Sequence, residues 1–480
     1  MIVGMYVGVD LGTTAVKVVV YDPLTKKVQM DISRAYEPVS TGPGMFEQNP
    51  LEIENAVFDA LRQVARSFRD VDAIVLDSAL HTLLLLDKNM EPLGNIIPWL
   101  DERSVEQVKR ISKDEQLTQH LHKKTGCPAD TVYPFYKILW LSENGKLKSA
   151  SKIVSQKDYI IYKLTGQIVS DISVASGSGC LDIHTKQWCY DELKDLAGID
   201  SEKLPGLVSV TESFRLCKAA AGRSGLLEGL PVVVGLSDAA ASSIGAGAGI
   251  DDSLTLSVGS SAAIRTIVSQ PPEDYPAPGI WCYVLDEDHY ITGAAIKNGG
   301  YVFDWYVKLF SRCDHGTVVK KVEKTFANLD LENSVLFYPF IFGKRFPKFD
   351  PTPSARFDRL KSTTTEEQVA RSVLEGIAFN LKRAFDVVKT MPKSLKKVVA
   401  TGGLTQADVW MKMVCAIFNH KILLQSSRQG AALGTVLYVL NKGNLCSLAA
   451  EFENTSEYKP DPELIEHYER LYQMWLDGLQ

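Results

Sequence analysis

Two stretches of the chain share one pattern of apolar and polar positions. Each consists of two apolar runs rich in β-branched residues, joined by a short turn of glycine and hydroxyl residues, which is typical of a β-hairpin. The first runs from Met5 to Tyr21 with Gly-Thr-Thr at its turn, and the second from Ser253 to Ile267 with Gly-Ser-Ser. The repetition favours an old duplication within the chain, and chance similarity of two hairpins is the alternative.

Elsewhere the apolar positions alternate between a helical period and short continuous runs. Apolar residues that recur every three or four positions predict helices, and short apolar runs bounded by turn residues predict buried strands. The expected helices are residues 51–67, 104–110, 136–144, 365–388, 407–418 and 462–479, and the expected strands are 73–76, 232–234 and 397–401. This mixture predicts an α/β fold.

The length of 480 residues predicts two domains, because a single core rarely grows beyond roughly 250 to 300 residues. We place the domains at 1–246 and 247–480, since a Gly-Ala-Gly-Ala-Gly run from Gly245 breaks the helical pattern there. The same run resembles part of a dinucleotide fingerprint, but it follows a helix and lacks the full spacing. The hypothesis of an NAD-linked oxidoreductase is therefore supported by this run alone.

Composition narrows the classes of partner. Hydrophobic residues make up 45% and charged residues 23%, and the formal charge is -6 without a long Lys/Arg run, which argues against nucleic acid as a partner. The chain starts directly with strand-like sequence and has no apolar run of membrane-spanning length, so we expect a cytoplasmic protein without a membrane partner. The eight scattered cysteines are expected to be reduced and structural. The oligomeric state stays open, with a homodimer as one expectation.

The first hairpin turn carries candidate phosphate chemistry. Asp10 ends the first strand, and Gly12, Thr13, Thr14 and Lys17 follow it. Backbone N–H groups and hydroxyls in such a turn can bind phosphate. Asp10 is a candidate ligand of Mg²⁺, directly or through water, because Mg²⁺ favours oxygen ligands and keeps much of its hydration. The alternative is an ordinary hairpin with a turn-forming aspartate.

A second candidate lies where an apolar strand that begins at Val232 meets a helix of small residues. Asp238 stands at this junction. Phosphoryl transfer requires the attacking hydroxyl to be oriented and relieved of its proton, and an aspartate performs this task in other kinases. Asp238 fits the role of base. The alternative is a plain helix N-cap.

A third candidate is the glycine pair Gly402 and Gly403 after a predicted strand. Two glycines allow a flat ring or a phosphate to approach the backbone closely, although a ligand-free turn has the same sequence. The chain lacks the Gly-x4-Gly-Lys-Ser/Thr loop, so a nucleotide would have to be bound without a P-loop.

Taken in order, these three segments resemble the two phosphate motifs and the adenosine motif of the FGGY carbohydrate kinases. Further segments similar to the family are residues 44–48, 99–103, 164–166, 175–176 and 371–379. The resemblance implies an α/β fold of two RNase H-like (actin-like ATPase) domains, with an interdomain active-site cleft that closes on ATP and a sugar.

The resemblance also implies roles for individual residues. Asp238 matches the catalytic base, and Asp10 matches the acidic residue that works with Mg²⁺. The nucleotide-binding set is Gly12, Thr13, Thr14, Lys17, Gly259, Ser260, Gly300, Gly402, Gly403 and Ala407. Ala407 departs from the Ser or Asn that the family often has there, and residues 343–347 depart from the usual Gly-Glu-Arg form.

Substrate binding is expected at Leu80, His81, Trp99 and Arg103. The segment Ser-Ala-Leu-His-Thr at residues 78–82 is closer to the Ser-Ala-Met-His-Ser form of gluconate kinases than to the Gln-Met-His-Gly pattern of xylulose kinases. A sugar acid needs a cation for its carboxylate, and Arg103 or Lys297 could supply it. The alternatives are a structurally paired cation and, for His81, a satisfied core histidine.

The expected function is therefore ATP-dependent phosphorylation of a sugar acid, D-gluconate to 6-phosphogluconate, with ATP and Mg²⁺ as cofactors. D-xylulose is the alternative substrate. A rival of another class is an actin- or chaperone-like ATPase that acts on a protein partner.

Overall fold

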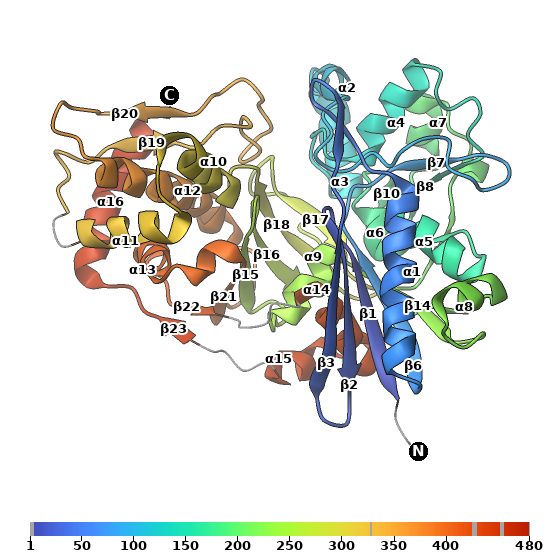
Figure 1. The fold of residues 1–480 in the computed structure, drawn as a ribbon. Coiled ribbons are helices and arrows are strands. Elements are labelled where there is room, and N and C mark those ends of the chain that lie inside the picture. Colours follow the sequence, from blue (N-terminus) through green and yellow to red (C-terminus); the bar gives the residue numbers. More distant parts are fainter. Residues whose placement is uncertain (1–3, 327–328, 425–429, 452–455, 480) are drawn as a thin grey trace.

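The computed structural model describes residues 4–326, 329–424, 430–451 and 456–479. Each half of the chain builds one mixed β-sheet flanked by helices, and the two halves lie side by side (Figure 1). The predicted α/β class with two actin-like parts is confirmed. The two predicted hairpins are both present.

The N-terminal sheet has six strands. In spatial order they are β13 (Ser213–Arg215), β14 (Pro231–Ser237), β6 (Val71–Ser78), β1 (Met5–Leu11), β2 (Ala15–Asp22) and β3 (Lys27–Ala35). The central strands β14, β6 and β1 are parallel to one another, while β2 and β3 continue the sheet in antiparallel pairing. Parallel strands buried on both faces read as continuous apolar runs, which explains why the sequence pattern reveals them so clearly.

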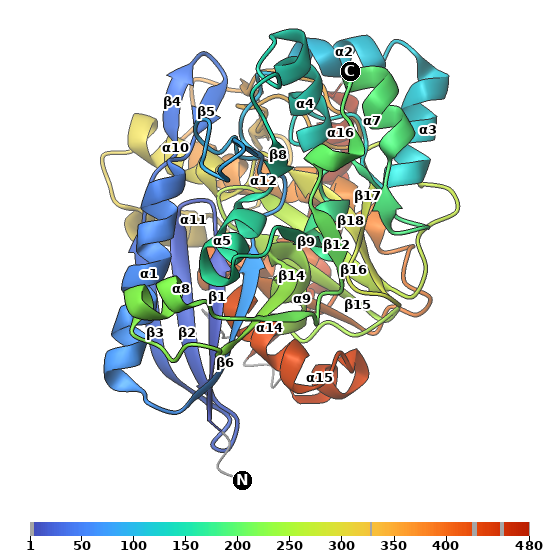
Figure 2. The same cartoon turned by 90° about the vertical axis from the view of Figure 1, so that its right-hand side faces the viewer.

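Helices cover this sheet and build a lobe beside it (Figure 2). They are α1 (Pro50–Ser67), α2 (Val105–Ile111), α3 (Glu115–Thr125), α4 (Pro134–Glu143), α5 (Gln156–Thr165), α6 (Ile172–Ser176), α7 (Tyr190–Ala197), α8 (Lys218–Ser224) and α9 (Asp238–Gly245). Short strand pairs complete the half: β4 (Val39–Gly42) with β5 (Met45–Glu47), β7 (Leu84–Leu86) with β8 (Lys152–Val154), β9 (Val169–Asp171) with β12 (Gly206–Val208), and β10 (Leu181–Asp182) with β11 (Gln187–Trp188). Local signals set the ends of these helices; α1, for example, begins after Asn49, whose side chain accepts a hydrogen bond from the Leu51 N–H.

The C-terminal sheet has seven strands. In spatial order they are β17 (Trp281–Val284), β18 (Tyr290–Ile296), β16 (Ala262–Val268), β15 (Ser253–Val258), β21 (Lys397–Thr401), β22 (Ile422–Leu424) and β23 (Ser456–Tyr458). The helices of this half are α10 (Gly300–Phe310), α11 (His315–Thr325), α12 (Glu366–Val388), α13 (Asp408–Phe418), α14 (Gly430–Leu440), α15 (Leu445–Glu451) and α16 (Pro462–Asp477), and the pair β19 (Leu336–Tyr338) and β20 (Arg356–Asp358) lies apart from the sheet.

The two sheets share one topology. In each, a hairpin (β1–β2 or β15–β16) extends on one side to a third antiparallel strand (β3 or β18). On the other side follow two parallel strands (β6 and β14, or β21 and β22) and an antiparallel edge strand (β13 or β23). This agreement over six strands favours the duplication over chance similarity of two hairpins.

Helix α14 joins the halves, because it belongs to the C-terminal half but packs against β1 and β6 of the N-terminal sheet and against α9. Glycines permit this approach: a Cβ on Gly245 would lie 2.0 Å from the Gly430 carbonyl oxygen, and one on Gly434 would lie 2.0 Å from that of Ala241. The run at Gly245 thus ends a helix and packs two helices closely, which leaves the dinucleotide interpretation without structural support.

Two further expectations concern the chain as a whole. No helix among the described residues is long and apolar enough to cross a membrane. All eight cysteines are free thiols and most are buried, as expected.

Candidate active site

Three strand ends of the N-terminal sheet bring three carboxylates together. Asp10 lies one residue before the end of β1, beside its register partner Asp77 of β6, and Asp238 directly follows β14 on the other side of β6. Since β1, β6 and β14 are parallel, their carboxyl ends meet at one edge, where open α/β sheets bind ligands. Asp77 is fully buried and Asp10 is 8% exposed.

Backbone geometry aims Asp238 into the interdomain cavity. Gly235 has a φ of 69° in a bulge of β14, and its Cβ would lie 1.9 Å from the Leu76 carbonyl oxygen. Ser237 is the N-cap of α9, so the plain-cap alternative for Asp238 is wrong. The Asp238 Oδ1 instead accepts hydrogen bonds from the N–H groups of Ala239 (2.8 Å) and Leu80 (3.3 Å).

Burial dominates the electrostatics of the three acids. It raises the pKa of Asp10 to about 6, with Lys17 opposing the shift and Asp238 adding to it. Burial, followed by the charge of Asp10, holds the pKa of Asp77 well above its usual range. Burial also raises the pKa of Asp238, against the opposing charge of Arg265. The site therefore concentrates negative charge in a place that favours a proton or a cation.

The first hairpin turn is fixed by three side chains. The Tyr36 hydroxyl donates to the Gly12 carbonyl oxygen, Gln48 Nε2 donates to that of Thr13 (2.6 Å), and Trp99 Nε1 donates to the Thr13 Oγ1 (3.0 Å). Thr14 and Lys17 are exposed. Lys17 lies directly opposite Asp10 in the register of the hairpin. The turn thus has a fixed shape next to the acids, as a phosphate-binding loop requires.

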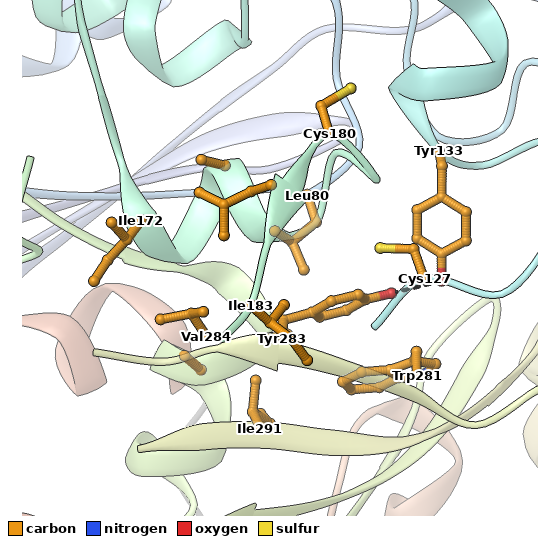
Figure 3. Close-up of a cluster of buried hydrophobic side chains, with 14 of the residues drawn as sticks. Leu80, Cys127, Tyr133, Ile172, Cys180, Ile183, Trp281, Tyr283, Val284 and Ile291 are labelled. Carbon is orange, nitrogen blue, oxygen red and sulfur yellow. Dashed lines mark hydrogen bonds between the residues drawn. The ribbon is translucent and has the colours of Figure 1, made fainter. Parts of the chain in front are cut away.

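A cavity of about 230 Å³ lies between the two halves beside these groups. The N-terminal half contributes Thr13, Leu80, His81, Trp99, Asp238 and Ala239, and the C-terminal half contributes Ser257, Ser261, Ala262, Ala263, Arg265, Trp281, Tyr283, Ala295 and Arg345. Figure 3 shows the apolar packing around one end, where Leu80 lies next to Tyr283 and where Trp281 stacks on the Tyr283 ring. The hydroxyls of Tyr133 and Tyr283 are 2.9 Å apart.

His81 is held in one orientation. Its φ of 65° is unusual for a side-chain-bearing residue, and its Nδ1 lies 2.5 Å from the Gly177 carbonyl oxygen. Burial, with a smaller contribution from the charge of Arg345, lowers the pKa of His81 to about 3. The ring is therefore neutral with Nδ1 protonated, which makes Nε2 a hydrogen-bond acceptor.

The second hairpin turn lies opposite the first, and Gly259 and Ser260 are exposed there. Their carbonyl oxygens accept hydrogen bonds from the N–H groups of Gly300 (2.7 Å) and Tyr301 (3.2 Å) at the start of α10. Gly402 follows β21 beside this turn with a φ of 104°, and a Cβ there would lie 2.3 Å from the Val258 carbonyl oxygen. The structure thus brings these predicted nucleotide residues to one place.

The remaining two predicted nucleotide residues follow directly. Gly403 begins the 3₁₀ turn η2 (Gly403–Gln406), and no described atom lies within 4 Å of a Cβ built on it. Ala407 is the N-cap of α13 and makes no side-chain cap. The N-cap position of this helix therefore carries no polar side chain.

Both cations predicted for a substrate carboxylate are already engaged. Arg103 pairs with Asp101 and Glu47, each at 2.8 Å, and it does not line the cavity. Lys297 reaches across the cleft to Glu102. The sequence analysis missed two cavity cations, Arg265 and Arg345, and it gave no role to the Asp77 carboxylate. A charged residue inside an apolar strand, as Arg265 is, was the available signal.

Comparisons with known proteins agree with this arrangement. The model of the N-terminal domain of the FGGY family of carbohydrate kinases matches residues 5–245, and the model of the C-terminal domain matches residues 254–440. The chain belongs to the FGGY family of carbohydrate kinases. It is thus a phosphotransferase with an alcohol group as acceptor. The hypothesis of an ATPase that acts on a protein partner is replaced by that of a sugar kinase.

Gluconate kinases and xylulose kinases both stand among the similar proteins. A gluconokinase of Bacillus licheniformis is 29% identical, over 98% of this chain and 94% of the relative. The structure of a gluconate kinase from Lactobacillus acidophilus is 30% identical with a TM-score of 0.91, and that of a ligand-bound xylulose kinase from the same organism is 29% identical with a TM-score of 0.91. Both alignments cover 99% of this chain and 97% of the other. Overall similarity therefore does not separate gluconate from xylulose.

Proposed function

We propose that this FGGY kinase transfers the γ-phosphoryl group of ATP to the C6 hydroxyl of D-gluconate. The observation that carries the proposal is the position of Asp238. This carboxylate lines a cavity between the two hairpin turns, so a hydroxyl bound next to it would face a phosphoryl group held by the turns.

Asp238 is proposed as the base. The Leu80 and Ala239 N–H groups fix one of its oxygens, and its raised pKa makes the carboxylate a better proton acceptor than an exposed aspartate. As the C6 oxygen attacks the γ-phosphorus, its proton passes to Asp238, the bond to the β,γ-bridging oxygen breaks, and ADP leaves. The Thr13 hydroxyl, on the cavity wall, would donate to the transferring group.

The acids beside Asp238 fit a divalent cation. Both Asp77 oxygens are buried without a hydrogen-bond partner among the described residues, and Asp10 lies next to them. Within those residues no group of three or more His, Cys, Asp or Glu side chains forms a metal site; a set of only two carboxylates suits Mg²⁺, which completes its shell with water and phosphate. Asp10 and Asp77 would hold Mg²⁺, which neutralises charge on the phosphates when bound.

The nucleotide is proposed to lie over the second turn. Its phosphates would contact the two turns through the predicted residues Gly12, Thr13, Thr14, Lys17, Gly259, Ser260 and Gly300. The adenosine would rest on Gly402 and Gly403, where no side chain intervenes. Because Ala407 offers no polar atom, backbone or apolar contacts would replace side-chain recognition of the base.

The substrate assignment rests on the charge of the cavity. Two guanidinium groups, Arg265 and Arg345, line it, which suits an anionic sugar acid better than neutral D-xylulose. Leu80, His81 and Trp99 would contact the carbon chain and its hydroxyls. Arg103 is proposed to act indirectly, by fixing the loop that bears Trp99.

An assay of ADP release with MgATP tests the proposal. D-gluconate, D-xylulose, L-ribulose and glycerol are compared with a blank without sugar, and turnover is expected with gluconate. Turnover with xylulose alone would keep the kinase and overturn the substrate assignment. A homodimer stays a prediction, which light scattering after size-exclusion chromatography tests.

A further inference from the structure

We propose that Arg265 binds the carboxylate of the sugar acid and thereby selects it over neutral sugars. This inference rests on the proposed function, because it assigns the anionic end of the same substrate. Arg265 lies on β16 and lines the cavity together with Asp238.

The first argument is the lack of a carboxylate in contact with Arg265, since the charge of Asp238 acts on its guanidinium only from beyond ion-pair distance. The Arg265 Nη1 donates to the Ser257 hydroxyl (3.1 Å), while its buried Nε has no hydrogen-bond partner. No described carboxylate lies within 4 Å of its guanidinium, in contrast to Arg103 and Arg345. A half-buried guanidinium whose buried Nε has no partner is costly unless an anion completes it.

The second argument is the sheet register, which separates Arg265 from the phosphate-binding turn. Ser257, Ala263 and Ala295 form one row across β15, β16 and β18, next to that turn. The backbone of Arg265 lies two residues further along β16, opposite Gly293, about 6 to 7 Å from Ala263 because a strand advances about 3.3 Å per residue. Its guanidinium reaches back to the Ser257 hydroxyl. The alanines leave space for the reacting groups, and Arg265 borders that space together with Asp238.

The third argument is the difference between Arg265 and Arg345. The Nε of Arg345 lies 2.9 Å from Asp130 Oδ2, so its charge is largely compensated before any substrate binds. Its terminal nitrogens can still donate to a sugar hydroxyl or to the outer carboxylate oxygen. Arg345 is therefore the supporting residue, and Arg265, which has no described carboxylate within 4 Å, is the cation that distinguishes an acid from an alcohol.

The test compares two ligands that differ only in this group: D-gluconate, and D-glucitol, which has a hydroxymethyl group in place of the carboxylate. Binding of each to the full-length protein is measured by calorimetry, and turnover by ADP release. For Arg265→Gln we expect the Kd and KM for gluconate to rise about 10- to 150-fold, since hydrogen bonds to charged groups contribute about 1.5 to 3 kcal/mol. The Kd and KM for glucitol and the KM for ATP should stay within about threefold of the wild-type values.

Controls separate charge from folding. Arg265→Lys retains the charge but loses the fork geometry, so it should recover part of the affinity for gluconate. Arg345→Gln should weaken the binding of gluconate less than Arg265→Gln does. Equal losses for both ligands, or a rise mainly in the KM for ATP, would overturn the inference and indicate a phosphate-binding role.

The outcome also distinguishes this inference from the proposed function. If the wild type phosphorylates only D-xylulose, gluconate is used as a competitor. Inhibition by gluconate that Arg265→Gln abolishes would retain the carboxylate site and reject the substrate. Failure of gluconate to bind the wild type would reject both.

Discussion

The two halves of this FGGY kinase have the same sheet topology but opposite chemistry at equivalent strand ends. In the N-terminal half, β1 and β6 carry the acids Asp10 and Asp77 in register, one residue before their ends. In the C-terminal half, the equivalent strands β15 and β21 carry Ser257 and Thr401 in register. One sheet edge therefore concentrates negative charge, and the other offers hydroxyls and bare backbone.

This difference shows how a duplicated scaffold divides a reaction between two surfaces. The acidic edge can hold a cation and accept a proton, and the glycine- and hydroxyl-rich edge can lie against phosphates without repelling them. The cavity lies between the two edges, so neither half is complete alone. The hydrogen bonds that fix the two turns also differ. Side chains of Tyr36, Gln48 and Trp99 donate to the first turn, whereas backbone N–H groups at the start of α10 donate to the second.

The largest effect is expected from Asp238→Asn, which removes the base from the acidic edge. The amide oxygen can still accept the two N–H groups, so the fold should persist. We expect kcat to fall by about 10²- to 10⁴-fold with nearly unchanged ATP binding, measured by ADP release and calorimetry. Asp59→Asn on the surface of α1 is the control, and full turnover of the Asp238 variant would refute the assignment.

The second test is the pH dependence of stability at the acidic edge. Because the folded pKa of Asp10 is raised to about 6, the folded state binds a proton that the unfolded chain releases at lower pH. The stability from this group is therefore present at low pH and is lost as the pH rises from about 4 to about 6, by about 3 kcal/mol. Lys17, Asp77 and Asp238 are the charged groups that act on it.

Urea unfolding of the wild type and Asp10→Asn between pH 4.5 and 7.5, without nucleotide or Mg²⁺, measures this difference. As the pH rises, the free energy of unfolding of the variant should increase relative to that of the wild type. Mg²⁺ added at pH 7.5 should stabilise the wild type more than the variant. A difference that is constant across this pH range would contradict the buried-acid account.

The third test addresses the other edge with a matched pair of glycines. Gly402→Ala introduces a Cβ beside the Val258 carbonyl oxygen at a φ of 104°, which is expected to cost about 1 to 3 kcal/mol and to raise the KM for ATP. Gly403→Ala meets no described atom within 4 Å and should leave stability nearly unchanged. Thermal melting and ATP titration measure both, and equal effects would argue against a strained turn at Gly402.

The smallest effect is expected from the ion pair that bridges the two halves. Lys297 is 9% exposed at its side chain and Glu102 is 36% exposed, so solvent screens much of the attraction. Glu102→Gln should raise the KM for the sugar by about two- to fivefold, consistent with about 0.5 to 1 kcal/mol for a partly exposed pair. Glu106→Gln, whose partner Lys109 lies on the same helix, is the control. An unchanged KM would show that the bridge contributes nothing to closure.

Much of the fold could be predicted because its signals are local. The strand predicted at 397–401 coincides with β21, and the helix predicted at 365–388 differs from α12 by one residue. Turn residues and apolar periods encode such elements within a few positions. The candidate acids Asp10 and Asp238 could also be predicted, since each stands at the end of an apolar strand.

The sequence by itself therefore determined the two hairpins, the strand–helix order and the motifs at the strand ends, because backbone geometry and apolar period act over a few residues. Only the tertiary structure decided which charges are free. Arg103 and Lys297 are engaged by acids, whereas Arg265 has no carboxylate partner among the described residues. Charge pairing depends on distances between groups remote in the chain, and these exist only once both sheets have folded and α14 has joined them.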